Sequence, residues 1–526
     1  MNTAEQIAAA LADRGVRHAF GMPGGATLPL LAALESVGID FVLVRNETSA
    51  GFMADAAAQL TGLGVCISTL GPGATNLLSG VTGSWLERSR VLAIAGQCSP
   101  ELEPIYTHQI IDQRALFRPV TRHTDALRIP HAGRQLALAL RHLDAGPPGP
   151  IYLELPADVA RARVDAGWRE ERPEPTAPAP SAMLRASETI RRARRPVIFV
   201  GCGDLSDSAA DALSALAERL GAPVMTTYRA KGMLDEHHPL SLGAAGLSPV
   251  VDAHQQALLA RADLLIAVGL DPVELRPNWL PGWPSDLPVI GIDPHGQPDL
   301  LCPMIADLRG ALPTILDALC PSGGSARWRP ESLAAHRAAI QEPFDDGPSG
   351  PGAAIAAIQR AVPGAVFSLD VGAHRITASH VLTARRPRRI LQSNGFSSMG
   401  TGLPMAISAA LCTPHPSVAI TGDMGLWMAM GELGVVAEHA LDVTVVYLAD
   451  RSLSLIELKQ ERTERTGGGV RFTNPDVAHL AAAFGGSGVT AVGADEVEEA
   501  VSHAVDTGGL HLIEAVIDAS HYRAQM

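Results

Sequence analysis

Two aspartates in the last third of the chain have the type and spacing needed to hold a metal ion. Asp423 follows the apolar run in "SVAITGDMG", and Asp450 ends the run "DVTVVYLAD", 27 positions downstream. Both runs are typical of buried strands. If those strands are neighbours in a parallel sheet, both carboxylates leave the sheet at one edge. Carboxylates that bind a hard cation together with phosphate oxygens form the usual Mg²⁺ site.

A third turn is expected at the same edge. The segment "DVGAHR" (370–375) also follows an apolar run, and Gly372 allows a phosphate to approach the backbone closely. The helix expected after Asp423 presents free N–H groups that attract anions, and Gly425 leaves room for a phosphate. A simpler interpretation stays open, because an aspartate after a strand is often only a helix N-cap.

Glu47 is the candidate for proton transfer. It lies in "VRNETSAGFMADAAAQLTG", where a strand passes into a helix of small residues. A glutamate in a tightly packed apolar junction can donate or relay a proton. The alternative is a glutamate that only stabilises the first turn of the helix.

The elements that position these residues alternate between apolar strands and helices rich in Ala and Leu. Strands that are apolar on both faces indicate parallel sheets covered by helices on both sides. The sequence predicts strands at 41–45, 64–69, 90–96, 151–156, 196–201, 263–269, 288–293, 365–372, 417–423, 442–450 and 511–518.

Two Pro-rich segments divide the chain into three α/β units. The first is "REERPEPTAPAPSA" (169–182), and the second boundary lies between 321 and 352. The predicted domains are therefore 1–165, 185–320 and 345–526.

Composition excludes several classes of protein. The 526 residues carry a formal charge of −14, which argues against nucleic acid as a partner. The chain has no uninterrupted apolar run long enough for a membrane helix, and its N-terminal residues lack the pattern of a signal peptide. The six cysteines are scattered without a C-x-x-C pair, so free thiols in a reducing compartment are expected. These features predict a cytoplasmic protein.

At this point the motifs resemble those of a known family, the thiamine-diphosphate-dependent 2-oxo acid enzymes. The closest resemblance is to the acetolactate synthase catalytic subunit and its uncharacterised relatives. It covers nearly the whole chain and implies three doubly wound α/β domains, in the order pyrimidine-binding, central and diphosphate-binding. The motifs that carry it, in order, are "MPGGA", "RNE" with "AGFMADAAAQLTG", "GPGATN", "DVGAHR", "SSMGTGLPMAISAAL" and "GDM" followed by "AD".

The resemblance implies a role for each matching residue. Glu47 would hydrogen-bond the aminopyrimidine ring nitrogen and promote deprotonation of the thiazolium carbon, and Gln113 would lie near the substrate. Asp423, Asp450 and the backbone carbonyl of Ser452 would bind Mg²⁺. The remaining cofactor contacts would come from Gly24 and Gly25 above the thiazolium, Met399 under the bent cofactor, and Gly372, Ala373, His374, Gly422, Met424 and Gly425 around the diphosphate.

The reaction implied is carboligation or decarboxylation of a 2-oxo acid. Acetolactate-synthase-like ligation, with pyruvate as donor and a second carbonyl compound as acceptor, is favoured by the "PGGA" loop. Simple non-oxidative decarboxylation that releases an aldehyde is the alternative. The resemblance also implies a homodimer or homotetramer, since in this family the two sides of one cofactor site come from different chains.

Four departures from the family pattern are visible. Asp450 replaces the second Asn of the metal motif and adds a negative charge, which Arg451 is expected to offset. Met424 replaces the third residue of Gly-Asp-Gly and requires a negative φ. The synthase has Phe-Gln-Glu where this chain has "DQR" (112–114), and Asp271 stands where its substrate-contacting Arg is expected.

The central unit raises two further alternatives. Its "GCGDLS" has two glycines of a dinucleotide fingerprint but Ser206 in place of the third. The synthase binds a flavin in this domain and many relatives bind nothing there, so FAD is not the favoured expectation. A nicotinamide-dependent oxidoreductase and a degenerate, non-catalytic partner subunit are the two rival functions.

Overall fold

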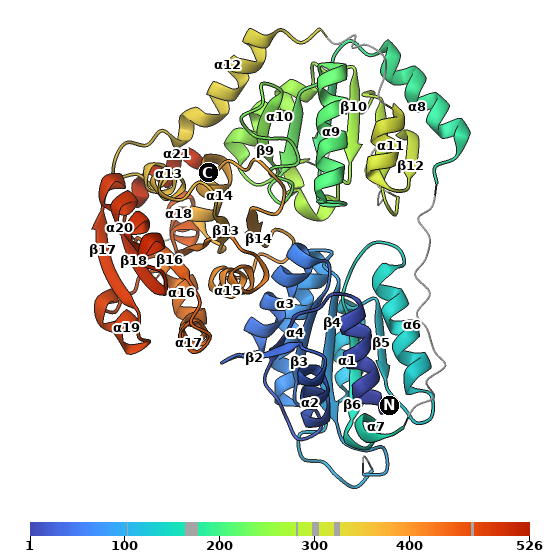
Figure 1. Cartoon of the computed structure of the whole chain (residues 1–526). Helices are drawn as coiled ribbons and strands as arrows, with labels where there is room; N and C mark the ends of the chain where they lie inside the picture. Colours follow the sequence, from blue (N-terminus) through green and yellow to red (C-terminus); the bar gives the residue numbers. More distant parts are fainter. Residues whose placement is uncertain (103, 164–176, 280–281, 297–303, 320–326, 464–467) are drawn as a thin grey trace.

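The computed structural model describes residues 1–102, 104–163, 177–279, 282–296, 304–319, 327–463 and 468–526. Most of the first predicted linker, part of the second boundary, Cys302 and Cys320 lie outside these ranges. The described residues form three six-stranded sheets, and every strand pair is parallel. Figure 1 shows them as three lobes, N-terminal in blue, central in green and C-terminal in orange and red.

The first sheet has the order β2-β1-β3-β4-β6-β5. Its strands are β1 His18–Gly21, β2 Asp40–Leu43, β3 Gly64–Ser68, β4 Val91–Gln97, β5 His123–Ala126 and β6 Ile151–Pro156. The helices around it are α1 Thr3–Asp13, α2 Leu28–Ser36, α3 Glu47–Thr61, α4 Pro72–Leu86, α5 Gln113–Phe117, α6 Ala132–Asp144 and α7 Ala157–Arg161.

The central sheet has the order β12-β11-β10-β7-β8-β9. Its strands are β7 Pro196–Val200, β8 Val224–Thr227, β9 Ser241–Ala245, β10 Leu264–Val268, β11 Val289–Asp293 and β12 Met304–Arg309. The helices of this unit are α8 Pro180–Arg192, α9 Asp207–Leu220, α10 Pro249–Leu259 and α11 Leu312–Leu319, and α12 Pro330–Gln341 leads to the third unit.

The third sheet has the order β14-β13-β15-β16-β18-β17. Its strands are β13 Val366–Leu369, β14 Ile390–Gln392, β15 Ser417–Gly422, β16 Val443–Ala449, β17 Ser487–Val492 and β18 Leu510–Val516. Its helices are α13 Pro351–Ala361, α14 Ala373–Val381, α15 Gly402–Cys412, α16 Asp423–Ala429, α17 Leu433–Glu438, α18 Ser454–Arg462, α19 Val477–Ala483, α20 Ala494–Thr507 and α21 Tyr522–Gln525.

The predicted fold class is confirmed, because each sheet contains a strand reversal, a point where the chain crosses from one side of the sheet's first strand to the other, as in doubly wound sheets. The reversals lie between β1 and β3, between β7 and β10, and between β13 and β15. Ligands of such folds bind outside the carboxyl ends of the strands at these points. The first and third units also share one continuous apolar core, in which Ala54 and Leu77 belong to the same cluster as Leu403 and Leu433.

No helix in the described ranges is both long and apolar enough to cross a membrane.

Candidate cofactor and metal site

The strand reversal of the third sheet gathers the C-terminal motif residues at one edge. Strands β13 and β15 are paired there. A turn of three residues leads from β13 to α14 at Ala373, and β15 passes directly into α16 at Asp423. The free N–H groups at the start of α14 therefore lie beside the end of β15, where an anion is favoured.

Asp370, the first residue after β13, organises this edge. The residue is 1% exposed, and its carboxylate accepts hydrogen bonds from the Val371, Gly400 and Thr401 backbone N–H groups and from the hydroxyls of Thr401 and Thr421. Burial raises the pKa of Asp370, while these donors oppose the shift. Asp370 thus fixes the loop that contains Met399 against β13 and β15.

His374 lies over two of the glycines predicted to surround a diphosphate. A Cβ built on Gly372 would lie 2.5 Å from the His374 ring, and one built on Gly422 would lie 3.2 Å from it. The ring is 5% exposed, and burial lowers the pKa of His374 to about 3, so it is neutral at pH 7. Its Nε2 is buried and has no hydrogen-bond partner among the described residues, a position that a bound ligand can complete.

Asp423 and Asp450 follow neighbouring strands, which is the condition that the sequence prediction left open. β15 pairs with β16 in a register that sets Gly422 opposite Leu448. Asp423 accepts from the backbone N–H of Met424 at 2.9 Å and of Arg451 at 2.8 Å. Asp450 accepts from the Ser452 N–H at 3.1 Å and from the Ser454 hydroxyl. These bonds fix the positions of both carboxylates at this edge.

The chemistry of this pair fits a hard divalent cation. Burial raises the pKa of both carboxyls, that of Asp450 to about 6, and the negative charge of Asp423 contributes to the shift of Asp450. A cation between them would relieve this cost. Within the described ranges no three His, Cys, Asp or Glu residues are grouped to hold a metal, so phosphate, carbonyl or water oxygens would complete the coordination.

The neighbours of the two aspartates differ partly from expectation. Met424 is helical, in the first turn of α16, so its replacement of glycine causes no backbone strain. The exposed side chain of Arg451 lies 3.7 Å from Glu514 and does not pair with Asp450, so the expected charge offset is absent. Ser452 is buried, and its hydroxyl donates to Glu457 at 2.5 Å.

Glu47 begins α3 but is not its cap. Asn46 caps the helix by accepting from the Thr48 N–H, and this leaves the Glu47 side chain to face α4. Asn76 Nδ2 donates to Glu47 Oε2 at 3.0 Å, and Glu47 is 5% exposed. The two helices come this close because Gly51 lies against Gly80, where an added Cβ would meet backbone atoms at 2.6 Å.

The other N-terminal candidates follow β1 and β4. Gly24 lies against Thr69, whereas Gly25 is exposed and would have open space around a Cβ. Gln113 is 1% exposed, accepts from the Gly71 N–H and donates to the Gly96 carbonyl, so its amide links the ends of β3 and β4. None of the hydrogen bonds or ion pairs among the described residues joins this edge to Asp423, Asp450 or His374.

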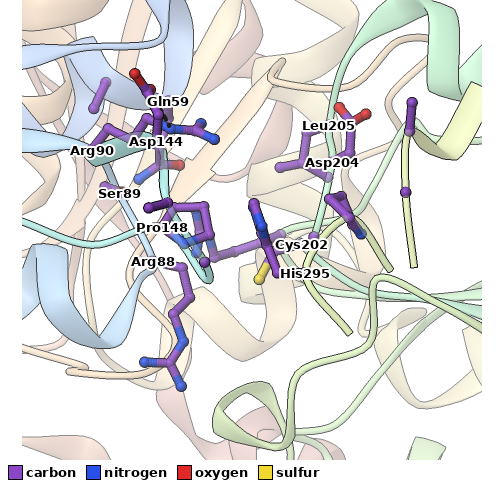
Figure 2. Close-up of a pocket in the computed structure, with 18 residues that line it drawn as sticks. Gln59, Arg88, Ser89, Arg90, Asp144, Pro148, Cys202, Asp204, Leu205 and His295 are labelled. Carbon is purple, nitrogen blue, oxygen red and sulfur yellow. Dashed lines mark ion pairs between the residues drawn. The ribbon is translucent and has the colours of Figure 1, made fainter. Parts of the chain in front are cut away.

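A cavity lies at the strand reversal of the central sheet, facing the first unit. Its volume is about 580 Å³, and Figure 2 shows Cys202, Asp204 and His295 of the central unit across from Arg88, Arg90 and Asp144. Ser206, which replaces the third fingerprint glycine, caps α9 by accepting from the Ala209 N–H.

Several residues of the site were not singled out from the sequence. Asp370 and Arg375 stand inside "DVGAHR", where position after a strand was the available signal. Asn76 lies in the quoted "GPGATN". Glu432 accepts from the Arg45 and Asn46 N–H groups and so ties the segment before Glu47 to the third unit. No local pattern marks Glu432.

Comparison with known proteins agrees with this arrangement. Three family models match in the expected order: the N-terminal TPP binding domain of thiamine pyrophosphate enzymes at 1–116, their central domain at 183–299 and their C-terminal TPP binding domain at 370–515. The third match includes Asp370, His374, Asp423 and Asp450.

Curated relatives match along nearly their whole lengths. Acetolactate synthase isozyme 2 large subunit of Escherichia coli (strain K12) is 31% identical over 98% of this chain and 96% of its own length. A probable acetolactate synthase large subunit of Methanocaldococcus jannaschii is 30% identical over 98% and 92%, and a probable 2-ketoarginine decarboxylase of Pseudomonas aeruginosa is 32% identical over 96% and 92%. This chain belongs to the family of thiamine pyrophosphate enzymes.

Proposed function

We propose that the protein is a thiamine-diphosphate- and Mg²⁺-dependent enzyme that acts on a 2-oxo acid, with acetolactate-synthase-like ligation of pyruvate as the first candidate. The main support is the edge of the third sheet, where the buried Asp423 and the half-buried Asp450 follow adjacent strands. They lie at the same edge as glycines, a helix N-terminus and the His374 Nε2, which has no hydrogen-bond partner among the described residues. Asp423, Asp450 and Ser452 would hold Mg²⁺. Gly372, Ala373, His374, Gly422, Met424 and Gly425 would surround the diphosphate.

When bound, thiamine diphosphate would provide a nucleophilic carbon and an electron sink for loss of CO₂. The chain supplies position and proton transfer. Glu47, with one carboxylate oxygen held by Asn76, would share a proton with the aminopyrimidine ring. Met399 would support the bent cofactor, and Gly24 and Gly25 would leave space above the thiazolium. Gln113 would act on the substrate side by fixing the loops after β3 and β4.

Simple decarboxylation is the second candidate, and one specific contact favours it. Asp271 stands at the place of the synthase's substrate-contacting Arg and pairs with Arg88 at 2.7 Å. This position therefore offers the substrate no free positive charge, unlike the position in the synthase. The match to a probable 2-ketoarginine decarboxylase points the same way.

Product analysis separates these candidates. Pure protein loaded with thiamine diphosphate and Mg²⁺ is incubated with pyruvate, with 2-ketoarginine and with a panel of other 2-oxo acids. Acetolactate or acetoin from pyruvate supports ligation, whereas an aldehyde with equimolar CO₂ supports decarboxylation. A loaded protein that releases no CO₂ from any of them supports the non-catalytic partner subunit instead.

We also infer an oligomer, because among the described residues no hydrogen bond or ion pair joins Glu47 to Asp423, Asp450 or His374. A homodimer or homotetramer would bring Glu47 of one copy toward Asp423 of another. Sedimentation velocity at working concentration tests this, and a monomer that retains turnover would contradict it.

A further inference from the structure

One buried carboxylate touches all three units. Glu87, the C-cap residue of α4, is 2% exposed. Its Oε2 lies 3.3 Å from Arg229 Nη1 of the central unit, and the same guanidinium donates to the Glu87 backbone carbonyl. Its Oε1 accepts from the Ser393 hydroxyl at 2.8 Å, the Gly395 N–H at 2.8 Å and the Phe396 N–H at 3.2 Å.

The segment that Glu87 holds connects β14 to α15 and contains Met399. At its far end Gly400 and Thr401 donate to Asp370, and near its start Arg375 donates to the Ser393 carbonyl. Ser397 has a φ of 53°, a conformation that a residue with a side chain adopts only when its surroundings impose it. The shape of residues 393–401 therefore depends on partners outside the segment.

The packing at Gly395 gives an independent sign of the same junction. A Cβ built there would lie 2.8 Å from the Leu86 carbonyl oxygen of the first unit and 3.0 Å from Val273 Cγ2 of the central unit. The segment thus lies between two other units with no free space.

Arg229 supplies the paired cation in this arrangement. Glu87 is too buried to be solvated, and a buried carboxylate needs a paired cation or donors. Arg229, with its side chain 5% exposed, is the direct ion-pair partner of Glu87. Glu274 also interacts with the Arg229 charge, but its hydrogen bonds come from the Cys202 N–H and the Thr227 hydroxyl.

We propose that Glu87, neutralised by Arg229, is a positioning residue that sets the conformation of residues 393–401 and so the surface that Met399 presents to the cofactor. The central unit then controls the cofactor site without touching the cofactor. This inference rests on the proposed function, in that the cofactor is thiamine diphosphate.

The test uses the full chain as Glu87→Gln, which keeps the side-chain shape and removes the charge. Its matched control is Glu236→Gln. The Glu236 side chain, 5% exposed, also lies at a junction of units: it pairs with Lys231 at 2.6 Å and accepts from the Ala384 N–H of the third unit. It makes no contact with residues 393–401, so it reports the general cost of removing such a charge.

Two measurements are made on each variant. Hydrogen exchange of the Gly395 and Phe396 amides in cofactor-free protein measures how firmly residues 393–401 are held. Calorimetric titration in the presence of Mg²⁺ measures the affinity for thiamine diphosphate. For Glu87→Gln we expect faster exchange confined to 393–401 and affinity lower by about tenfold or more, since it weakens bonds to a charged acceptor. Glu236→Gln should change neither. Unchanged exchange and affinity in Glu87→Gln, or equal losses in Glu236→Gln, would overturn the inference.

Arg229→Lys serves if Glu87→Gln does not fold, because it keeps the charge and loses the fixed geometry. For Arg229→Lys we expect an exchange rate and a cofactor affinity between those of the wild type and those expected for Glu87→Gln. Wild-type values in both measurements would contradict the role of Arg229. Wild-type protein that does not bind thiamine diphosphate would contradict the proposed function, while the exchange measurement, made without cofactor, would still decide the role of Glu87.

Discussion

The Asp370 carboxylate occupies the space that a side chain at Gly425 would need. A Cβ at Gly425 would lie 1.9 Å from Asp370 Oδ2, and the same oxygen accepts from the Gly400 N–H and the Thr421 hydroxyl. The glycine after the metal motif is therefore required by the protein itself, in addition to any space it leaves for a phosphate.

Gly425→Ala should destabilise the third unit even without cofactor. The methyl group must displace the Asp370 carboxylate, which then loses buried hydrogen bonds, at a cost of about 2–4 kcal/mol. Urea unfolding of the cofactor-free protein measures this. Gly364→Ala is the control, because a Cβ there meets nothing within 4 Å. Equal stability of the two variants would contradict this account of Gly425.

Glu47→Gln should abolish turnover and spare cofactor binding. The amide keeps a polar group beside Asn76 but cannot share a proton with the cofactor, so we expect a loss in kcat of about 10²–10⁴. CO₂ release and calorimetric affinity for thiamine diphosphate are measured on the same sample. A rate near that of the wild type would remove Glu47 from the mechanism.

Asp450→Asn should weaken Mg²⁺ binding without weakening diphosphate binding. It removes one negative charge from the pair, and affinity for a hard cation follows the number of charged ligands, so we expect about a tenfold loss. Titration of Mg²⁺ at saturating thiamine diphosphate measures it. Glu457→Gln removes a nearby charge that is not a proposed ligand and serves as control. If both variants lose the same Mg²⁺ affinity, Asp450 attracts Mg²⁺ only through its charge and does not coordinate the ion.

Asp293 should make stability fall as the pH rises from about 4 to 6. Burial raises the pKa of Asp293 from 3.8 to about 6, and Asp271 and Asp307 add to the shift. The protonated carboxyl stabilises the fold fully below pH 4, and this contribution is lost as the pH passes the folded pKa. Asp293→Asn removes this pH dependence. The free energy of unfolding of the variant minus that of the wild type should therefore be higher at pH 7.5 than at pH 4.5, by about 1–3 kcal/mol. Urea midpoints at both values test this, and a difference independent of pH would contradict it.

Strongly apolar strands were predictable because burial on both faces leaves a mark in the sequence. The predicted strand at 151–156 is β6 without change, and 417–423 is β15 with one residue more. The strands that were missed are β1, β5, β8, β9, β12, β14 and β17, all of six residues or fewer. Two of them carry visibly weak signals. β14 has three residues, and β17 lies at the sheet edge with mostly exposed side chains.

The sequence by itself determined the class of fold and the presence of Asp423, Asp450 and Glu47 at strand ends, because apolar periodicity and residue type act locally. Which strands are neighbours was decided only by the tertiary structure, and with it the pairing of β15 with β16 that puts the two aspartates at one edge. The contacts of Glu87 with Arg229 and of Asp370 with Gly400 were equally invisible. They join residues far apart in the chain, and their strength comes from burial, which a position acquires only when the units pack together.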